Sequence, residues 1–205
     1  MPASTASFIS WVLHPLFVPL ILFLVANAYD PFLIYNPEIL KVVIGCLVVN
    51  VIAPAVAIWL MLKRGVIGDP ELSNRRERML PYLLVIFYFL CTYVIFRLRD
   101  AHISNALLSM LLAVPIGLLI SMIVNFWWKI SVHSLAQGGA VGALAGLAVA
   151  HGVDTLVPVT FFILTSGLVS AARVRLLLHT NAQVYAGFSV GLVLNMLMVS
   201  FEWVL

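Results

Sequence analysis

The chain has 205 residues, of which 63% are hydrophobic and only 9% are charged, and its formal net charge is +3. A soluble domain carries charge on about a quarter of its residues, so this composition excludes a protein with a solvated surface on all sides. Long runs rich in Leu, Val and Ile favour helices over a transmembrane barrel, whose strands would alternate apolar and polar residues. The sequence therefore predicts an all-α, polytopic membrane bundle that forms a single domain over residues 1–205.

Seven apolar segments approach the roughly 20 residues that a helix needs to cross the hydrocarbon core of a bilayer. They cover residues 7–27, 38–62, 81–98, 105–127, 134–152, 155–172 and 182–203. Pro15 and Pro19 would kink the first segment or make it partly re-entrant, so we expect six or seven transmembrane helices. The fifth segment is built largely from Gly and Ala, which let neighbouring helices approach closely, and we therefore place it at the centre of the bundle.

Polar residues gather in three loops, at 63–81, 127–134 and 172–183. An even number of spans separates each loop from the next, so all three emerge at one membrane face whether or not the first segment spans. Of the eleven basic residues, all but Lys41, Arg97 and Arg99 lie on this face. The usual cytoplasmic excess of Lys and Arg explains part of the bias and would place the three loops in the cytoplasm.

The two shorter loops combine cations with imidazoles. Lys129 lies close to His133, and Arg173 and Arg175 precede His179. Taken singly, His133 reads as an interfacial histidine and Arg175 as a side chain that reaches the headgroups. Together, cationic groups and imidazoles at one membrane face make a site for an anion, most naturally a phosphate.

Three stretches resemble the signatures of the type 2 phosphatidic acid phosphatase family. In "SAARVRLLLHTNAQ", Arg173 is followed by five residues, His179, three residues and Gln183, which is similar to the third signature: S-R, five residues, H, three residues, D. "KISVHS" resembles the second signature, P-S-G-H, and "RRERMLP" is a looser match to the first, which supplies a basic residue and an R-P pair. The likeness covers about residues 70–200 and is that of a divergent bacterial member.

The resemblance implies a role for each matched residue. His179 would be the nucleophile that attacks phosphorus, His133 the general acid for the leaving oxygen, and Gln183 would take the place of the Asp that orients the nucleophile. The groups that hold the phosphate oxygens would come from Arg173, Ser131, Val132, Lys129, Arg75, Arg76 and Arg78. The family needs no metal or other cofactor. The sequence shows no metal-ligand spacing, and we expect its two cysteines to pack as small hydrophobes without a disulfide.

Departures from the signatures bear on turnover more than on binding. Gln183 can accept a hydrogen bond from the imidazole and orient it, but it cannot stabilise an imidazolium with a full charge. Val132 replaces Gly and adds bulk where a phosphate would approach, and Ile130 replaces Pro.

The expected function is hydrolysis of a lipid phosphate or diphosphate, such as phosphatidate, phosphatidylglycerol phosphate or a polyprenyl diphosphate, by a multi-pass protein of the bacterial inner membrane. Its expected partners are this substrate and membrane lipids, and not nucleic acid. The alternative is a non-catalytic lipid-phosphate binder or transporter that retains the phosphate pocket. A metal-dependent intramembrane enzyme is disfavoured because the spans lack paired carboxylates. Bacterial members of the family mostly face the periplasm, whereas the basic bias places this site in the cytoplasm.

Overall fold

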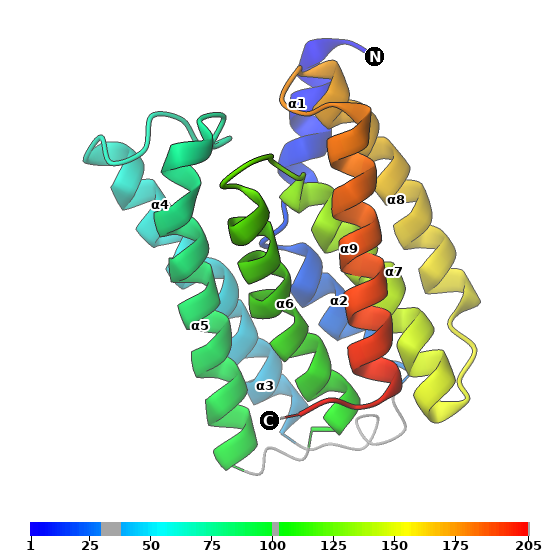
Figure 1. Ribbon diagram of the computed structural model, residues 1–205. Coiled ribbons are helices and arrows are strands. Elements are labelled where there is room, and N and C mark those ends of the chain that lie inside the picture. Colours follow the sequence, from blue (N-terminus) through cyan, green and yellow to red (C-terminus); the bar gives the residue numbers. More distant parts are fainter. Residues whose placement is uncertain (30–37, 100–102, 205) are drawn as a thin grey trace.

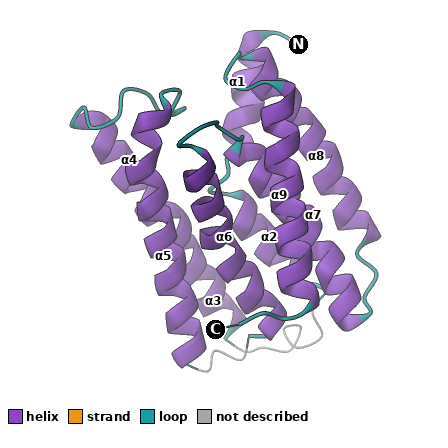
Figure 2. Ribbon diagram, viewed as in Figure 1, coloured by secondary structure: helices purple, strands orange, loops and turns teal. Residues whose placement is uncertain are grey.

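The computed structural model describes residues 1–29, 38–99 and 103–204, and every regular element in these ranges is a helix (Figure 1, Figure 2). Within them, six helical stretches are long and apolar enough to cross a membrane. The predicted all-α, multi-pass bundle is therefore confirmed. The six spans are Ile39–Lys63, made of α3 (Ile39–Cys46), a π-helical turn (Leu47–Ile52) and α4 (Ala53–Lys63); Arg75–Leu98, made of a 3-10 turn (Arg75–Arg78) and α5 (Met79–Leu98); α6 (Asn105–Val124); α7 (Val132–His151); α8 (Leu156–Arg175); and α9 (Asn181–Ser200).

The first apolar segment forms two short helices in series, α1 (Ala3–Val12) and α2 (Val18–Asn27). Figure 1 shows α1 at one end of the bundle, beside the N-terminus, and α2 farther towards the other end. The break agrees with the predicted kink, because Pro15 lies between the helices and Pro19 lies in the first turn of α2, where a missing N–H costs no helical hydrogen bond. The break also brings His14 to the wall of an internal cavity.

All three polar loops lie at the same end of the bundle, as the counting of spans predicts (Figure 1). They are the connections from α4 to α5, from α6 to α7 and from α8 to α9. The α7–α8 connection and the C-terminus lie at the opposite end. Side chains from loops far apart in the sequence can therefore meet at the first end, which we call the polar end.

Helix α7 has the largest buried share of the six spans, which confirms the central position predicted for the segment rich in Gly and Ala. Its main chain touches that of α9. A Cβ atom added at Gly142 would lie 2.1 Å from the carbonyl oxygen of Leu192, and one at Gly191 would lie 2.0 Å from that of Leu135. Real Cβ atoms essentially never approach closer than 3.0 Å, so only glycine permits this contact between the two backbones.

The contact also aligns the starts of the two helices. Both α7 and α9 begin at the polar end (Figure 1). The backbone N–H of Ser131, just before α7, donates to the carbonyl of Gln183 in the first turn of α9 at 3.1 Å. Beside this bond, a Cβ at Gly187 would lie 2.5 Å from the Ser131 carbonyl oxygen. The second and third signature segments are thus held together by main-chain contacts, with the positive ends of both helices on the same side.

We expect Gly142→Ala to lower the free energy of unfolding by about 1–3 kcal/mol, the usual cost of overpacking, because the methyl group would push α7 away from the Leu192 carbonyl. Thermal unfolding of the purified proteins in detergent measures the effect. Gly167→Ala is the matched control, since a Cβ at Gly167 in α8 meets no atom within 4 Å. An unchanged midpoint for Gly142→Ala would contradict the direct contact of the two backbones.

Candidate functional site

An internal cavity of about 380 Å³ joins the polar end to the middle of the bundle. Most of its wall is apolar and comes from side chains such as Phe23 of α2, Phe89 of α5 and Met110 of α6. A cavity that is charged at one end and apolar elsewhere suits a ligand with a charged head and an apolar tail. Its charged and imidazole lining residues are His14, Glu71, Arg78, His133, Arg173 and His179, all from elements that meet at the polar end.

His179 lies in the loop before α9 and is 7% exposed. Its Nδ1 atom is 3.0 Å from Oε1 of Gln183, and the same oxygen accepts the backbone N–H of Thr180 at 3.2 Å. A backbone N–H can only donate, so the shared atom is the amide oxygen and Nδ1 of His179 carries the ring proton. The lone pair of the neutral ring is therefore on Nε2. Gln183 makes this contact as part of the capping box with Thr180 that starts α9.

Burial and nearby cations favour the uncharged form of His179. Burial lowers the pKa of His179 to about 3, with further lowering by Arg78, Arg173 and Lys129, while the hydrogen bond that His179 donates to Gln183 opposes the shift. Burial also lowers the pKa of Lys129, with smaller contributions from Arg78 and Arg173. Cations from three separate loops thus act on one imidazole. Their mutual repulsion would be relieved by an anion placed among them.

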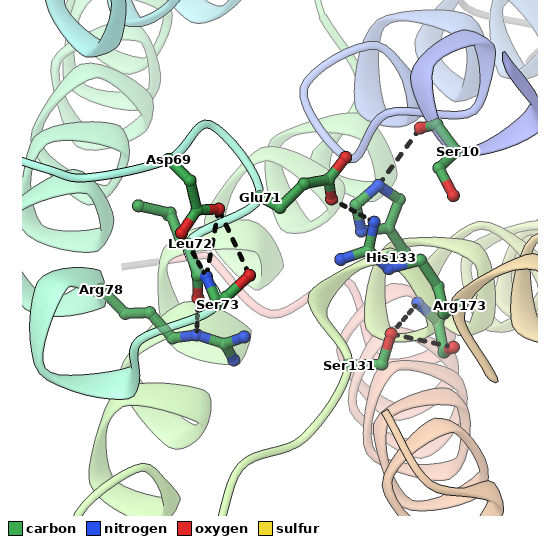
Figure 3. Close-up of polar contacts among 10 residues, drawn as sticks. Ser10, Asp69, Glu71, Leu72, Ser73, Arg78, Ser131, His133 and Arg173 are labelled. Atoms are coloured by element: carbon green, nitrogen blue, oxygen red, sulfur yellow. Dashed lines mark hydrogen bonds and ion pairs between the residues drawn. The ribbon is translucent and has the colours of Figure 1, made fainter. Parts of the chain in front are cut away.

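Arg173, in the last turn of α8, is 1% exposed. Its guanidinium forms an ion pair with Glu71 from the α4–α5 loop (Figure 3). Its Nε atom is buried and has no hydrogen-bond partner among the residues that the structure describes. A buried guanidinium with an unused donor is suited to a second acceptor, and phosphate oxygens match its geometry.

Among the three arginines predicted to hold phosphate from the α4–α5 loop, only Arg78 lines the cavity. It is 4% exposed and donates its Nε–H to the carbonyl of Leu72 at 2.9 Å. The structure does not bring Arg75 and Arg76 to the cavity lining. Arg75 is exposed and donates to the carbonyl of Trp127 at 3.3 Å, and Arg76 is exposed on the same 3-10 turn.

The second signature divides into residues that shape the helix and residues that line the cavity. The buried hydroxyl of Ser131 caps α7 by accepting the backbone N–H of Ser134 at 3.3 Å. Val132 and His133 line the cavity, whereas Ser131 and Lys129 do not. Lys129 is half-buried beside the site and reaches His179 only through its charge. Ser131 therefore holds the start of α7 and presents the next two residues.

The sequence did not predict the role of the N-terminal segment. His133 Nε2 lies 3.2 Å from the carbonyl oxygen of Ser10 and therefore donates to it (Figure 3). The rings of His133 and His14 pack edge to face, with centroids 5.5 Å apart. His14 accepts the backbone N–H of Leu16 on Nδ1 at 3.3 Å, which leaves the proton of the neutral ring on Nε2. The proline-marked break is the one sequence signal that points to this segment.

No protein-family model, curated protein or solved structure matches the chain. The resemblance of the three segments to the phosphatidic acid phosphatase signatures therefore stays a prediction from the sequence. Among the residues that the structure describes, no group of His, Cys, Asp and Glu side chains is arranged to hold a metal ion.

We expect the ring of His179 to stay neutral, with its proton on Nδ1, from pH 8 down to about pH 4, because its pKa is near 3. Nitrogen NMR of histidine-labelled protein in detergent reports both charge and tautomer, and His179→Gln assigns the signal. In Gln183→Leu the acceptor is lost, so the ring should divide between its two tautomers. A charged ring at pH 6, or a proton on Nε2 in the wild type, would contradict the geometry.

Proposed function

We propose that the protein is a membrane-embedded phosphatase that releases phosphate from a lipid phosphate or diphosphate through a phosphohistidine intermediate. The observation that carries the proposal is the state of His179. Its Nδ1 atom lies 3.0 Å from the amide oxygen of Gln183, which leaves the lone pair of a neutral ring on Nε2, and His179 lines a cavity that two buried arginines also line. These are the properties that a nucleophilic imidazole needs.

Binding would place the charged head of the lipid at the polar end and its apolar tail in the body of the cavity. Arg173 and Arg78 would donate charge-assisted hydrogen bonds to the phosphate oxygens, and Lys129 would add positive charge from the side. Phosphoryl transfer depends mainly on positioning and on such electrostatic stabilisation. The preformed excess of positive charge at this end therefore supplies what the transferred group requires.

In the first step, Nε2 of His179 attacks phosphorus, and the bond from phosphorus to the leaving oxygen breaks. The bound phosphate brings negative charge, which stabilises the protonated form of a neighbouring imidazole. His133 can then give a proton to the leaving oxygen. In the second step, water attacks the phosphohistidine, and His133 takes up the proton that the water loses. Gln183 keeps the His179 ring in position throughout, though its carbonyl stabilises the transient positive charge less than a carboxylate would.

One observation favours the second candidate function, a lipid-phosphate binder or transporter without catalysis. Gln183 occupies the position of the family's Asp and contacts His179 through an uncharged amide oxygen. This difference reduces turnover more than it reduces affinity for an anion. Measurement of phosphate release beside lipid binding separates the two functions.

We expect purified wild-type protein to release phosphate from at least one of phosphatidate, phosphatidylglycerol phosphate and a polyprenyl diphosphate. His179→Ala should lower that rate by about three orders of magnitude, because the nucleophile is lost. His151→Ala removes an imidazole at the other end of the bundle, where His151 contacts Glu202 at 2.8 Å, and should leave the rate unchanged. Equal release by wild type and His179→Ala would rule out the phosphohistidine route, and binding without release would favour the second candidate.

A carboxylate at position 183 should accelerate turnover. Gln183→Glu keeps the length of the side chain and the capping box of α9, and it adds a charge that stabilises the imidazolium formed during attack. We expect kcat to rise about tenfold or more, measured by phosphate release at saturating substrate. Asn181→Asp adds the same charge to the exposed first turn of α9 and is the matched control. If both variants changed kcat equally, the effect would be one of general charge and not of contact with His179.

A further inference from the structure

Two adjacent residues of the α4–α5 loop bind the two buried arginines of the site. The carboxylate of Glu71 pairs with Arg173, and the carbonyl of Leu72 accepts the Nε–H of Arg78 at 2.9 Å (Figure 3). These two arginines are the groups that the proposed function assigns to the phosphate oxygens. The loop therefore places a carboxylate and a carbonyl where these oxygens would bind.

The loop is shaped to make these contacts. Leu72 has a φ of 50°, in the left-handed region that a branched side chain rarely adopts. The carboxylate of Asp69 accepts both the backbone N–H and the hydroxyl of Ser73 at 3.3 Å, which closes the loop around residues 70–72. A strained backbone held by its own hydrogen bonds indicates a fixed position for the main chain at Glu71.

The two partners of the ion pair differ in their access to water. The side chain of Arg173 is 2% exposed, whereas that of Glu71 is 40% exposed. If Arg173 moved away from Glu71, its guanidinium would be left in an apolar surrounding without a partner, which is costly. Glu71 can turn into water by rotation of its own side chain. The carboxylate is thus the exchangeable member of the pair.

We propose that Glu71 is a specificity-determining residue, whose carboxylate competes for the phosphate position on Arg173 and so sets the affinity that a ligand needs in order to enter, which dianionic phosphomonoesters reach and monoanionic phosphodiesters do not. This inference rests on the proposed function of the site as a lipid-phosphate site. It adds the reason why the site is not filled by the phosphodiester lipids that surround it in a bilayer.

The discrimination follows from the charge and the number of terminal oxygens. Exchanging one carboxylate for one phosphodiester monoanion leaves the charge beside Arg173 unchanged, so the competition gives the diester no electrostatic gain. A phosphomonoester carries close to two charges and three strong acceptor oxygens. It can replace Glu71 on Arg173 and still offer an oxygen to the unpartnered Nε atom or to Arg78. A diester has only two terminal oxygens and one charge, so it gains less from the exchange than the dianion does.

The test measures binding and not catalysis. Decylphosphonate and its monomethyl ester share one tail and one P–C bond that the protein cannot hydrolyse, and at mildly alkaline pH they carry two charges and one. Calorimetric titration of the purified wild type in neutral detergent should show tighter binding of the dianion by about tenfold or more. In Glu71→Gln, affinity for each of the two ligands should rise by about tenfold, because neither has to displace the carboxylate from Arg173.

Asp69→Asn is the matched control, because it removes one charge from the same loop and keeps an oxygen that can accept from Ser73. It should retain both wild-type affinities. The inference is overturned if Glu71→Gln leaves the affinity for the monoanion unchanged, if it weakens either ligand, or if Asp69→Asn raises both affinities as much. Equal wild-type affinity for both ligands would overturn it and leave the proposed function standing. Absence of binding by either ligand in all variants would overturn the lipid-phosphate site as well.

Discussion

The direct contact between the backbones of α7 and α9 is the constraint on which the site depends. Glycines such as Gly142 and Gly191 bring the two main chains together, and the hydrogen bond from Ser131 to the Gln183 carbonyl fixes the relative height of the helix starts. Each helix start carries part of the candidate chemistry, His133 on one and the support of His179 on the other. A bilayer offers no hydrophobic force to press helices together, so close packing of small residues has to supply the contact. The position of the imidazoles is therefore a consequence of how these two helices pack.

A second feature of the site is that its positive charges are buried. Arg173 and Arg78 are buried, and burial without a partner is costly for a guanidinium. The protein meets this cost with a carboxylate from Glu71 and a carbonyl from Leu72, both from one loop. The same loop thus stabilises both buried arginines. His179 is the third part of the arrangement, since burial, together with the cations that would hold a phosphate, lowers its pKa and favours the uncharged ring.

Much of the fold was predictable because it depends on local properties of the sequence. Segment length gave the spans, their parity placed the three loops at one end, and Gly and Ala content placed α7 at the centre. In the site, the spacing from Arg173 to Gln183 was informative because these residues lie on one helix end, one short loop and the next helix start. The contact of Glu71 with Arg173 joins residues 102 positions apart and depends on the fold of an irregular loop, which no spacing encodes. For the same reason the sequence could not separate Arg78 from its neighbours, nor bring His14 to His133.

The most direct test of the account is an experimental structure of the protein with orthovanadate, which adopts the five-coordinate geometry of phosphorus during transfer. The account predicts vanadium bonded to Nε2 of His179, with oxygens on Arg173 and Arg78 and with the Glu71 carboxylate turned away into water. Vanadate bound elsewhere, or bound at the polar end with the His179 ring directed away from it, would contradict the central claim that three separated loops form one phosphoryl site.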